Sequence, residues 1–141
     1  MDNNFWQQFD RGVFLLNVLA IIKNDKGEIL IGKRENDPYI KKLSWTFPGG
    51  RPAYQEDLEY YLKLEVKKKT NYDIEVGEVI FARTYTEDRR FLSIYYEAKI
   101  VGGAECAGEK FVETKWVKSR DLNKYFTTSI HPKLLEKIDI I

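Results

Sequence analysis

The chain has 141 residues, which is enough for one domain with a sizeable core. Apolar residues make up 43% of it, so the composition excludes an intrinsically disordered chain. Lys and Arg total 23 against 22 Asp and Glu, and this balance of +1 gives no electrostatic basis for general nucleic-acid binding.

No segment reaches the roughly 18 apolar residues that a membrane-spanning helix needs. The apolar run at residues 13–22 is too short and contains Asn17, and the N-terminus lacks the basic start and apolar core of a signal peptide. The single cysteine, Cys106, rules out an internal disulfide and is compatible with a reducing cytosol. We therefore expect a cytoplasmic protein that does not associate with membranes.

We expect one domain over residues 1–141, with residues 1–11 as an N-terminal arm. The arm carries Phe5, Trp6 and Phe9. It could pack on its own domain or on a partner subunit, which leaves a homodimer open.

The first elements are predicted to be strands. Residues 13–23 form a nearly continuous apolar run, typical of a strand that is covered on both faces. Residues 24–27, Asn-Asp-Lys-Gly, have turn chemistry and precede a strand at residues 28–34, so the two strands should form a hairpin. A loop is predicted at residues 35–44.

A glycine turn and a helix follow. The apolar segment at residues 45–47 should end at Pro48, which has no backbone N–H for a strand ladder. Gly49 and Gly50 then form the turn, because glycine adopts positive φ and lets other groups approach the backbone closely. The helix covers about residues 54–70, with apolar side chains at helical spacing and lysines in the last turn, where they suit the helix dipole. The apolar residues are Leu58, Tyr61, Leu62 and Val66, and the lysines are Lys67, Lys68 and Lys69.

The second half alternates strands with polar segments. The predicted elements are a strand at residues 73–86 with a kink near Gly77, a turn at 87–90, a strand at 91–101, a loop at 102–110 and a strand at 111–117. Ser119 is a plausible N-cap for a short helix with Leu122 and Phe126. Pro132 suits the first turn of a closing helix at residues 133–140. This order predicts an α/β fold of the α+β type, an α/β/α sandwich with a mixed β-sheet.

The segment that begins at the second glycine resembles the Nudix box. The family pattern is Gly, five residues, Glu, seven residues, Arg-Glu, an aliphatic residue, one residue, Glu-Glu, one residue, Gly and an aliphatic residue. Gly50, Glu56, Glu65 and Val66 match it at the right spacing. The departures are Leu64 for Arg, Lys68 and Lys69 for the Glu pair, Asn71 for Gly and Tyr72 for the aliphatic residue. The box is therefore degenerate, since its spacing is kept and much of its charge is changed.

Other segments extend the resemblance to this MutT-like family over roughly residues 12–140. Gly32-Lys-Arg34 and Pro48-Gly-Gly-Arg51 look closest to the GDP-mannose mannosyl hydrolase branch. That branch uses a His base in a late loop, whereas the loop at residues 102–110 has no His. The only His of the chain, His131, is interpreted as structural, so the mannosyl chemistry is not expected here.

The resemblance implies a reaction. In the Nudix family the box carboxylates hold Mg²⁺ or Mn²⁺ over a diphosphate, and water attacks a phosphorus atom of a nucleoside diphosphate linked to another group. Glu56 and Glu65 would be the catalytic residues, with Mg or Mn as cofactor and a nucleotide or nucleotide sugar as ligand. However, a lysine about 4 Å from a metal is repelled by roughly 4 kcal/mol per unit charge at an effective dielectric near 20. Lys68 and Lys69 thus argue against an ordinary site of two or three carboxylates.

The same residues allow other interpretations. Glu65 and Lys69 could form an ordinary i, i+4 ion pair on a surface helix, with Lys68 serving the same carboxylate. Glu56 could stabilise the helix start electrostatically instead of binding a metal. Lys68 or Lys69 could also stand where the cation would sit and meet phosphate directly.

Further candidates lie before the helix and late in the chain. Arg34 and Arg51 match arginines that contact diphosphate in the mannosyl hydrolase branch, although both could be solvated strand-end and turn residues. Among the late acids, Glu113 is the best placed by resemblance to complete a weak metal site with Glu56 and Glu65, although it could simply face solvent. The other late acids are Glu105 and Glu109, and the aromatic candidates for stacking on a base, or for the core, are Phe14, Tyr54 and Tyr85.

Two hypotheses of different classes follow. The first is a Nudix hydrolase with weak or altered activity on a nucleoside diphosphate derivative. The second is a Nudix-fold module without catalysis that binds a nucleotide or a protein partner. The changed charges at Leu64, Lys68 and Lys69 favour the second, and the usual activity of the family favours the first.

Overall fold

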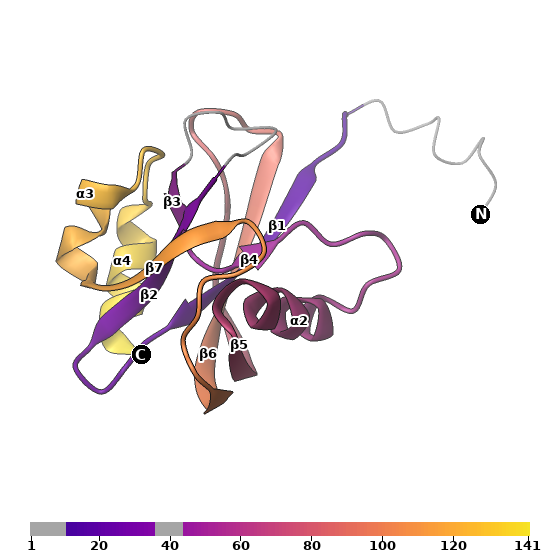
Figure 1. Cartoon of the computed structure of the whole chain (residues 1–141). Coiled ribbons are helices and arrows are strands. Elements are labelled where there is room, and N and C mark those ends of the chain that lie inside the picture. Colours follow the sequence, from indigo (N-terminus) through magenta and orange to yellow (C-terminus); the bar gives the residue numbers. More distant parts are fainter. Residues whose placement is uncertain (1–10, 36–43) are drawn as a thin grey trace.

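The computed structural model describes residues 11–35 and 44–141, and it places β-sheets between two groups of helices (Figure 1). Helix α2 (Leu58–Thr70) lies on one side. Helices α3 (Leu122–Tyr125) and α4 (Pro132–Ile140) lie on the other side, where α3 continues the 3₁₀ turn η1 (Ser119–Asp121). Most of the predicted arm, residues 1–10, and most of the predicted loop, residues 36–43, fall outside the described residues.

The strands form two sheets. They are β1 (Leu15–Ile22), β2 (Glu28–Arg34), β3 (Trp45–Thr46), β4 (Gly49–Gly50), β5 (Tyr72–Thr84), β6 (Phe91–Gly103) and β7 (Phe111–Lys118). One sheet has the order β4-β1-β6-β5 and is mixed, because β1 runs parallel to β6 and antiparallel to β4. The other has the order β3-β2-β7 and is antiparallel. The predicted α+β class with a mixed sheet is confirmed, and β5 carries register shifts around Gly77, where a kink was expected.

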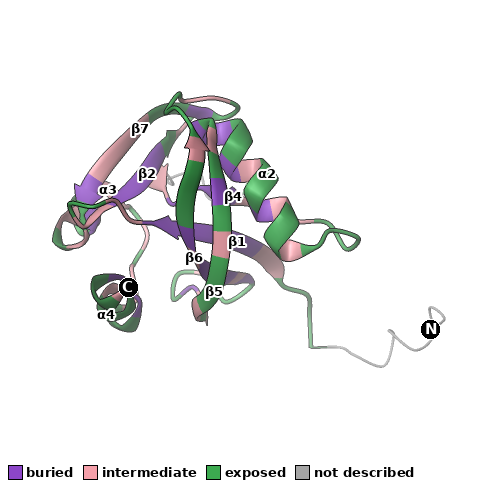
Figure 2. Ribbon diagram, turned by 90° about the horizontal axis from the view of Figure 1, so that it is seen from below, coloured by how far each residue is buried: buried purple, intermediate pink, exposed green. Residues whose placement is uncertain are grey.

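Strand β1 is covered on both faces, as its apolar run predicts. One set of its side chains packs in the cluster that contains Leu62 and Val66 of α2. The alternate set packs in the cluster that contains Leu134 and Ile138 of α4. The α2-side set is Val18, Ala20 and Ile22, and the α4-side set is Leu19 and Ile21. Figure 2 shows β1 as a buried strand and α2 with one exposed face.

The predicted hairpin between residues 13–23 and 28–34 is wrong. The turn forms, because Gly27 N–H donates to Asn24 O at 3.0 Å and Lys23 pairs with Ile29 in one antiparallel bridge. Beyond that bridge the strands separate into different sheets, with β1 beside β6 and β2 beside β7. Strand β1 thereby gains a longer partner, because β6 has 13 residues and β2 has 7.

The helix begins later than predicted, at Leu58 instead of about residue 54. Asp57 is the reason, since it has extended backbone geometry and its carboxylate accepts the Tyr60 N–H at 2.9 Å. Glu56 precedes this cap and is exposed. The lysines Lys67, Lys68 and Lys69 do occupy the last turn, as predicted.

The C-terminal segment contains one wrong prediction and one confirmed prediction. Ser119 does not cap a helix; it is the first residue of η1, and its hydroxyl donates to the Asp139 carboxylate. Pro132 does open α4. His131 is the N-cap of α4, accepts the Lys133 N–H at 3.1 Å and packs against Phe81, which agrees with the structural role expected for it. Among the described residues, no helix is long and apolar enough to cross a membrane.

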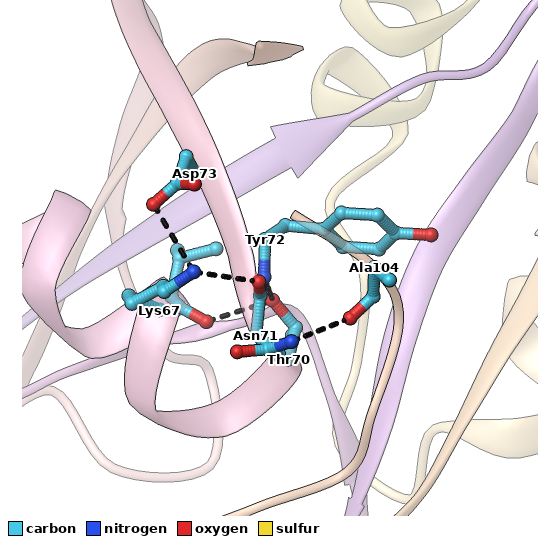
Figure 3. A network of polar contacts seen from close by, with 7 residues as sticks. Lys67, Thr70, Asn71, Tyr72, Asp73 and Ala104 are labelled. Carbon is cyan, nitrogen blue, oxygen red and sulfur yellow. Dashed lines mark hydrogen bonds and ion pairs between the residues drawn. The ribbon is translucent and has the colours of Figure 1, made fainter. Parts of the chain in front are cut away.

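Helix α2 ends at Thr70 and is capped by Asn71, which occupies the glycine position of the box pattern. Asn71 adopts the left-handed conformation with φ of 67°, and its N–H donates to Lys67 O at 2.9 Å. Its side chain donates to Ala104 O at 2.9 Å, and Lys67 reaches Asp73 at 3.2 Å (Figure 3). Asparagine tolerates this conformation better than most residues, which explains why it can replace glycine here.

We expect Asn71→Ala to be less stable than Asn71→Gly by about 1 kcal/mol. Both variants lose the side-chain bond to Ala104, so they differ mainly in the strain of the left-handed backbone. Urea unfolding of the two variants measures this difference. Equal stabilities would show that the conformation of residue 71 does not limit the helix end.

Candidate functional site

A cavity of about 370 Å³ lies where α2, the Gly49-Gly50 segment, β1 and the start of β7 meet. Its lining combines aromatic, amide, acidic and basic side chains. The lining residues are Asn17, Leu19, Arg34, Thr46, Phe47, Gly49, Gly50, Arg51, Tyr61, Glu65, Lys69, Tyr85, Glu109, Lys110 and Phe111. A cavity of this size, with polar groups converging on it, is typical of a small-molecule site.

The two glycines of β4 allow α2 and β1 to approach each other at the cavity. A Cβ at Gly49 would lie 2.0 Å from Val18 O, and a Cβ at Gly50 would lie 2.5 Å from the Tyr61 hydroxyl oxygen. The predicted turn is in fact a short strand, since Gly49 and Gly50 pair with Leu19 and Val18. The glycines are therefore needed for close approach, which was predicted, and not for positive φ.

Lys69 is the least exposed charged side chain described at the cavity. The residue is only 7% exposed. Its ammonium donates to Gly49 O and lies 3.4 Å from Glu65 Oε2. It also lies 5.9 Å from the centre of the Phe111 ring. The amine is thus held between a backbone carbonyl and a carboxylate at one end of the cavity.

Burial perturbs the pKa values of two groups in this region. It lowers the pKa of Lys69, an effect that Glu65 opposes and that the positive charge of Arg34 increases. It also raises the pKa of Tyr61 to about 12, with the negative charges of Glu65 and Glu56 adding to the shift. The Tyr61 phenol therefore keeps its proton at neutral pH and can donate a hydrogen bond into the cavity.

Glu65 takes part in two ion pairs, at the i+3 and i+4 spacing that was predicted, but the pair with Lys69 is not the surface pair expected, because Lys69 is buried. Its Oε2 faces Lys69 and its Oε1 lies 3.6 Å from Lys68 Nζ. The Lys68 side chain is 54% exposed, so this second pair contributes little to stability. The side chain of Glu65 is only 13% exposed, and it is the box carboxylate that remains at the cavity.

The charges along the cavity favour an anion. Arg34, Arg51, Lys69 and Lys110 contribute four cationic groups, while Glu65 and Glu109 contribute two carboxylates. Arg34 and Arg51 were both predicted as ligand-binding residues, and the structure brings them together with Lys69. Lys68, the fourth predicted residue of that set, does not belong to the described lining.

The β6–β7 loop carries Glu109 and Lys110 to the cavity, and its docking on the end of α2 explains their position. Gly108 N–H donates to Lys69 O and Cys106 N–H donates to Thr70 O, both at 3.0 Å. Glu105 fixes the loop from the other side through three donors. They are Tyr72 Oη at 3.1 Å, Thr114 Oγ1 at 2.6 Å and Trp116 Nε1 at 2.7 Å.

The acids predicted as metal ligands do not all reach this cavity. Glu65 lines it, while Glu56 and Glu113 are exposed and absent from the described lining. Glu109, which the sequence offered as a weaker candidate than Glu113, is the late acid at the cavity. Within residues 11–35 and 44–141, no group of three His, Cys, Asp or Glu residues could hold a metal ion. Metal binding by Glu56, Glu65 and Glu113 stays a prediction.

The groups at Lys69 also do not fit a divalent cation of the usual box type. Gly49 O and Glu65 Oε2 are oxygen atoms of the kind that Mg²⁺ prefers, but both already contact the Lys69 ammonium. A divalent cation beside that ammonium would be repelled by it.

The sequence missed several residues of the cavity. Tyr61 was predicted only as one of the apolar residues of the helix; it does pack against the α2-side cluster, but it also lines the cavity. Asn17 was noted only as a polar interruption of an apolar run. Asn17 is 7% exposed and lines the cavity, so a buried amide within a hydrophobic strand was the available signal. Of the aromatic candidates, Tyr85 lines the cavity and stacks on Phe91 at 6.2 Å, whereas Phe14 and Tyr54 are exposed.

Comparison with protein families gives one match, in which residues 13–138 match the NUDIX domain. The chain belongs to the Nudix family. This match covers most of the chain and includes the segment from Gly50 to Tyr72, which resembles the Nudix box. A search among curated proteins found no match.

Solved structures support the Nudix fold. A MutT protein from Methanosarcina mazei Go1 is similar with a TM-score of 0.74 and 21% identity, over 90% of this chain and 94% of that one. An ADP-ribose pyrophosphatase from Streptococcus suis has a TM-score of 0.64 and 16% identity, over 88% and 86% of the two chains. The NUDIX domain of NrtR from Shewanella oneidensis, complexed with ADP ribose, has a TM-score of 0.64 and 22% identity, over 97% of this chain and 96% of that one. At these identities the likeness establishes the fold alone.

Proposed function

We propose that this Nudix protein binds a nucleoside diphosphate derivative without a metal ion and hydrolyses it poorly or not at all. The observation that carries the proposal is the buried Lys69 ammonium, held by Gly49 O and Glu65 at a cavity that Arg34 and Arg51 also line. A diphosphate needs positive charge opposite its oxygens, and these side chains supply it.

The choice of ligand follows from the rest of the cavity and from the family. Tyr85 and Asn17 offer an aromatic face and an amide, which suit a base or a sugar. The structurally similar NrtR domain is complexed with ADP ribose, and the similar Streptococcus suis protein is an ADP-ribose pyrophosphatase. ADP-ribose and GDP-mannose are therefore the first ligands to test, the second because of the resemblance of the segments at Arg34 and Arg51.

Isothermal titration calorimetry of ADP-ribose and GDP-mannose, in EDTA and then in Mg²⁺ or Mn²⁺, tests the proposal. We expect binding in EDTA, no gain in affinity with metal and no heat of turnover. Binding that requires metal and is followed by hydrolysis would overturn the proposal in favour of a hydrolase. The absence of binding under every condition would instead favour a protein-interaction role.

Lys69→Met should weaken this binding about 10- to 100-fold, because a hydrogen bond to a charged group contributes about 1.5–3 kcal/mol. The change also leaves the Glu65 carboxylate without its Lys69 partner beside the bound anion. Lys63→Met is the matched control, since Lys63 is an exposed residue of the same helix and is absent from the described lining. Equal affinities for the two variants would show that the Lys69 ammonium does not contact the ligand.

A further inference from the structure

Asn17 gives the cavity a buried amide that has no partner within the described part of the protein. The residue is only 7% exposed, and it lines the cavity. Within residues 11–35 and 44–141, no group forms a hydrogen bond with its side chain. Burying a polar group without a hydrogen bond costs free energy, so an amide kept within the apolar strand β1 points to a ligand that supplies the missing bonds.

The position of Asn17 relative to Lys69 suits a nucleotide. Alternation along β1 places Asn17 on the same face as Leu19, which also lines the cavity. Leu19 pairs with Gly49, whose carbonyl accepts the Lys69 ammonium. Asn17 comes two residues earlier, roughly 7 Å along the strand. This spacing leaves room for a ribose between a phosphate at Lys69 and a base at Asn17.

The chemistry of the amide matches the edge of a nucleobase. A side-chain amide holds a C=O acceptor beside an NH₂ donor in one plane. The edge of adenine holds its amino donor beside a ring-nitrogen acceptor, so the two groups can form paired hydrogen bonds. Sugar hydroxyls rotate and need no such planar pair. Leu19, Phe47 and Tyr85 add apolar surface to the same cavity, which suits a flat ring better than a sugar.

We infer that Asn17 is a specificity-determining residue, which recognises the edge of the nucleotide base in this cavity through a donor and acceptor pair. The inference rests on the proposed function, because a phosphate held by Lys69, Arg34 and Arg51 is what brings the base to Asn17. The cavity then has two parts, with cations for the phosphates and one amide for the base. The hydrogen bonds that the amide lacks in the empty protein form only with the ligand bound.

Isothermal titration calorimetry in EDTA tests this role with ADP-ribose, etheno-ADP-ribose and inorganic pyrophosphate as probes. The etheno bridge joins the amino group of adenine to the adjacent ring nitrogen, which removes the donor and blocks the acceptor, and pyrophosphate has no base. We expect the wild type to bind the etheno analogue about 10-fold more weakly than ADP-ribose. Asn17→Leu should bind ADP-ribose about 10-fold more weakly than the wild type, bind both ADP-ribose forms equally and keep its affinity for pyrophosphate.

The stability of the ligand-free protein separates a binding role from a structural role. Asn17→Leu should raise the midpoint of urea unfolding, because it replaces an unpartnered amide by an apolar side chain of similar size in an apolar strand. Ser93→Ala is the matched control, since Ser93 is a buried polar residue that pairs with Asn17 in the sheet and is absent from the described lining. We expect Ser93→Ala to bind all the probes like the wild type.

The outcomes distinguish this inference from the proposed function. If ADP-ribose binds but the etheno bridge has the same effect on Asn17→Leu as on the wild type, Asn17 does not recognise the base and the binding function stands. If Asn17→Leu lowers the urea midpoint and weakens pyrophosphate as much as ADP-ribose, the amide is structural and the inference is wrong. If neither ADP-ribose nor pyrophosphate binds the wild type, both the inference and the function on which it rests are contradicted.

Discussion

Replacing both Lys68 and Lys69 by glutamate is expected to create divalent-metal binding that is stronger than any binding by the wild type. The change removes the ammonium from Gly49 O and Glu65 Oε2 and places two more carboxylates at the i+3 and i+4 positions of Glu65. Carboxylates at this spacing on one helix can converge on a hard cation. Calorimetric titration with Mn²⁺ measures the gain.

The same variant should depend on metal for its stability. Without metal, the new carboxylate at position 69 is buried near Glu65, and the two like charges repel each other. A metal at about one hundred times its Kd would restore about 2.7 kcal/mol. Thermal unfolding with and without Mn²⁺ therefore reports binding even if the unliganded variant is only marginally folded.

A charge-matched control separates the site from the overall charge. The double change Lys63→Glu with Lys68→Glu alters the net charge equally but leaves the Lys69 ammonium in place. We expect no metal binding from it. If the variant with Glu at 68 and 69 also fails to bind Mn²⁺ while folded, the idea that lysines block a latent metal site is wrong.

The elements that the sequence predicted well are those with a strong local pattern. The apolar run of β1 predicted a strand covered on both faces because every side chain in it had to be buried, and the structure divides it between the α2 and α4 sides. The partners of that strand could not be predicted in the same way. A turn at Asn24–Gly27 favours a hairpin locally, but the choice of β6 and β7 as partners depends on contacts between residues distant in sequence.

The part of the candidate site that lies on α2 could be predicted, because the spacing of the Nudix box determines which residues share a helix face. Glu65 and Lys69 lie one helical turn apart, so their contact follows from helix geometry alone. The sequence offered no comparable reason to place Glu109, and not Glu113, at the cavity. Its position at the cavity depends on the docking of its loop, through Glu105 and the end of α2. Side-chain contacts of that kind leave no periodic signal in a sequence.

Gly49→Ala is expected to destabilise the protein by about 3 kcal/mol or more, which is a large fraction of the stability of a typical domain. The new Cβ would lie 2.0 Å from Val18 O and 2.9 Å from Leu19 Cα. These are backbone atoms of a strand buried on both faces, so they cannot move away without disrupting the sheet. Urea unfolding measures the loss, seen as a lower midpoint.

Gly50→Ala is the informative comparison, because its Cβ meets side chains instead of backbone. The nearest atoms are the Tyr61 hydroxyl oxygen at 2.5 Å and Glu65 Cγ at 3.2 Å. Movement of these side chains should limit the loss of stability to about 1 kcal/mol. It would also displace Glu65 from Lys69, so Gly50→Ala should change ADP-ribose binding in calorimetry while remaining folded. If both variants lose the same amount of stability, the close approach of backbone atoms is not the reason that β4 needs glycine.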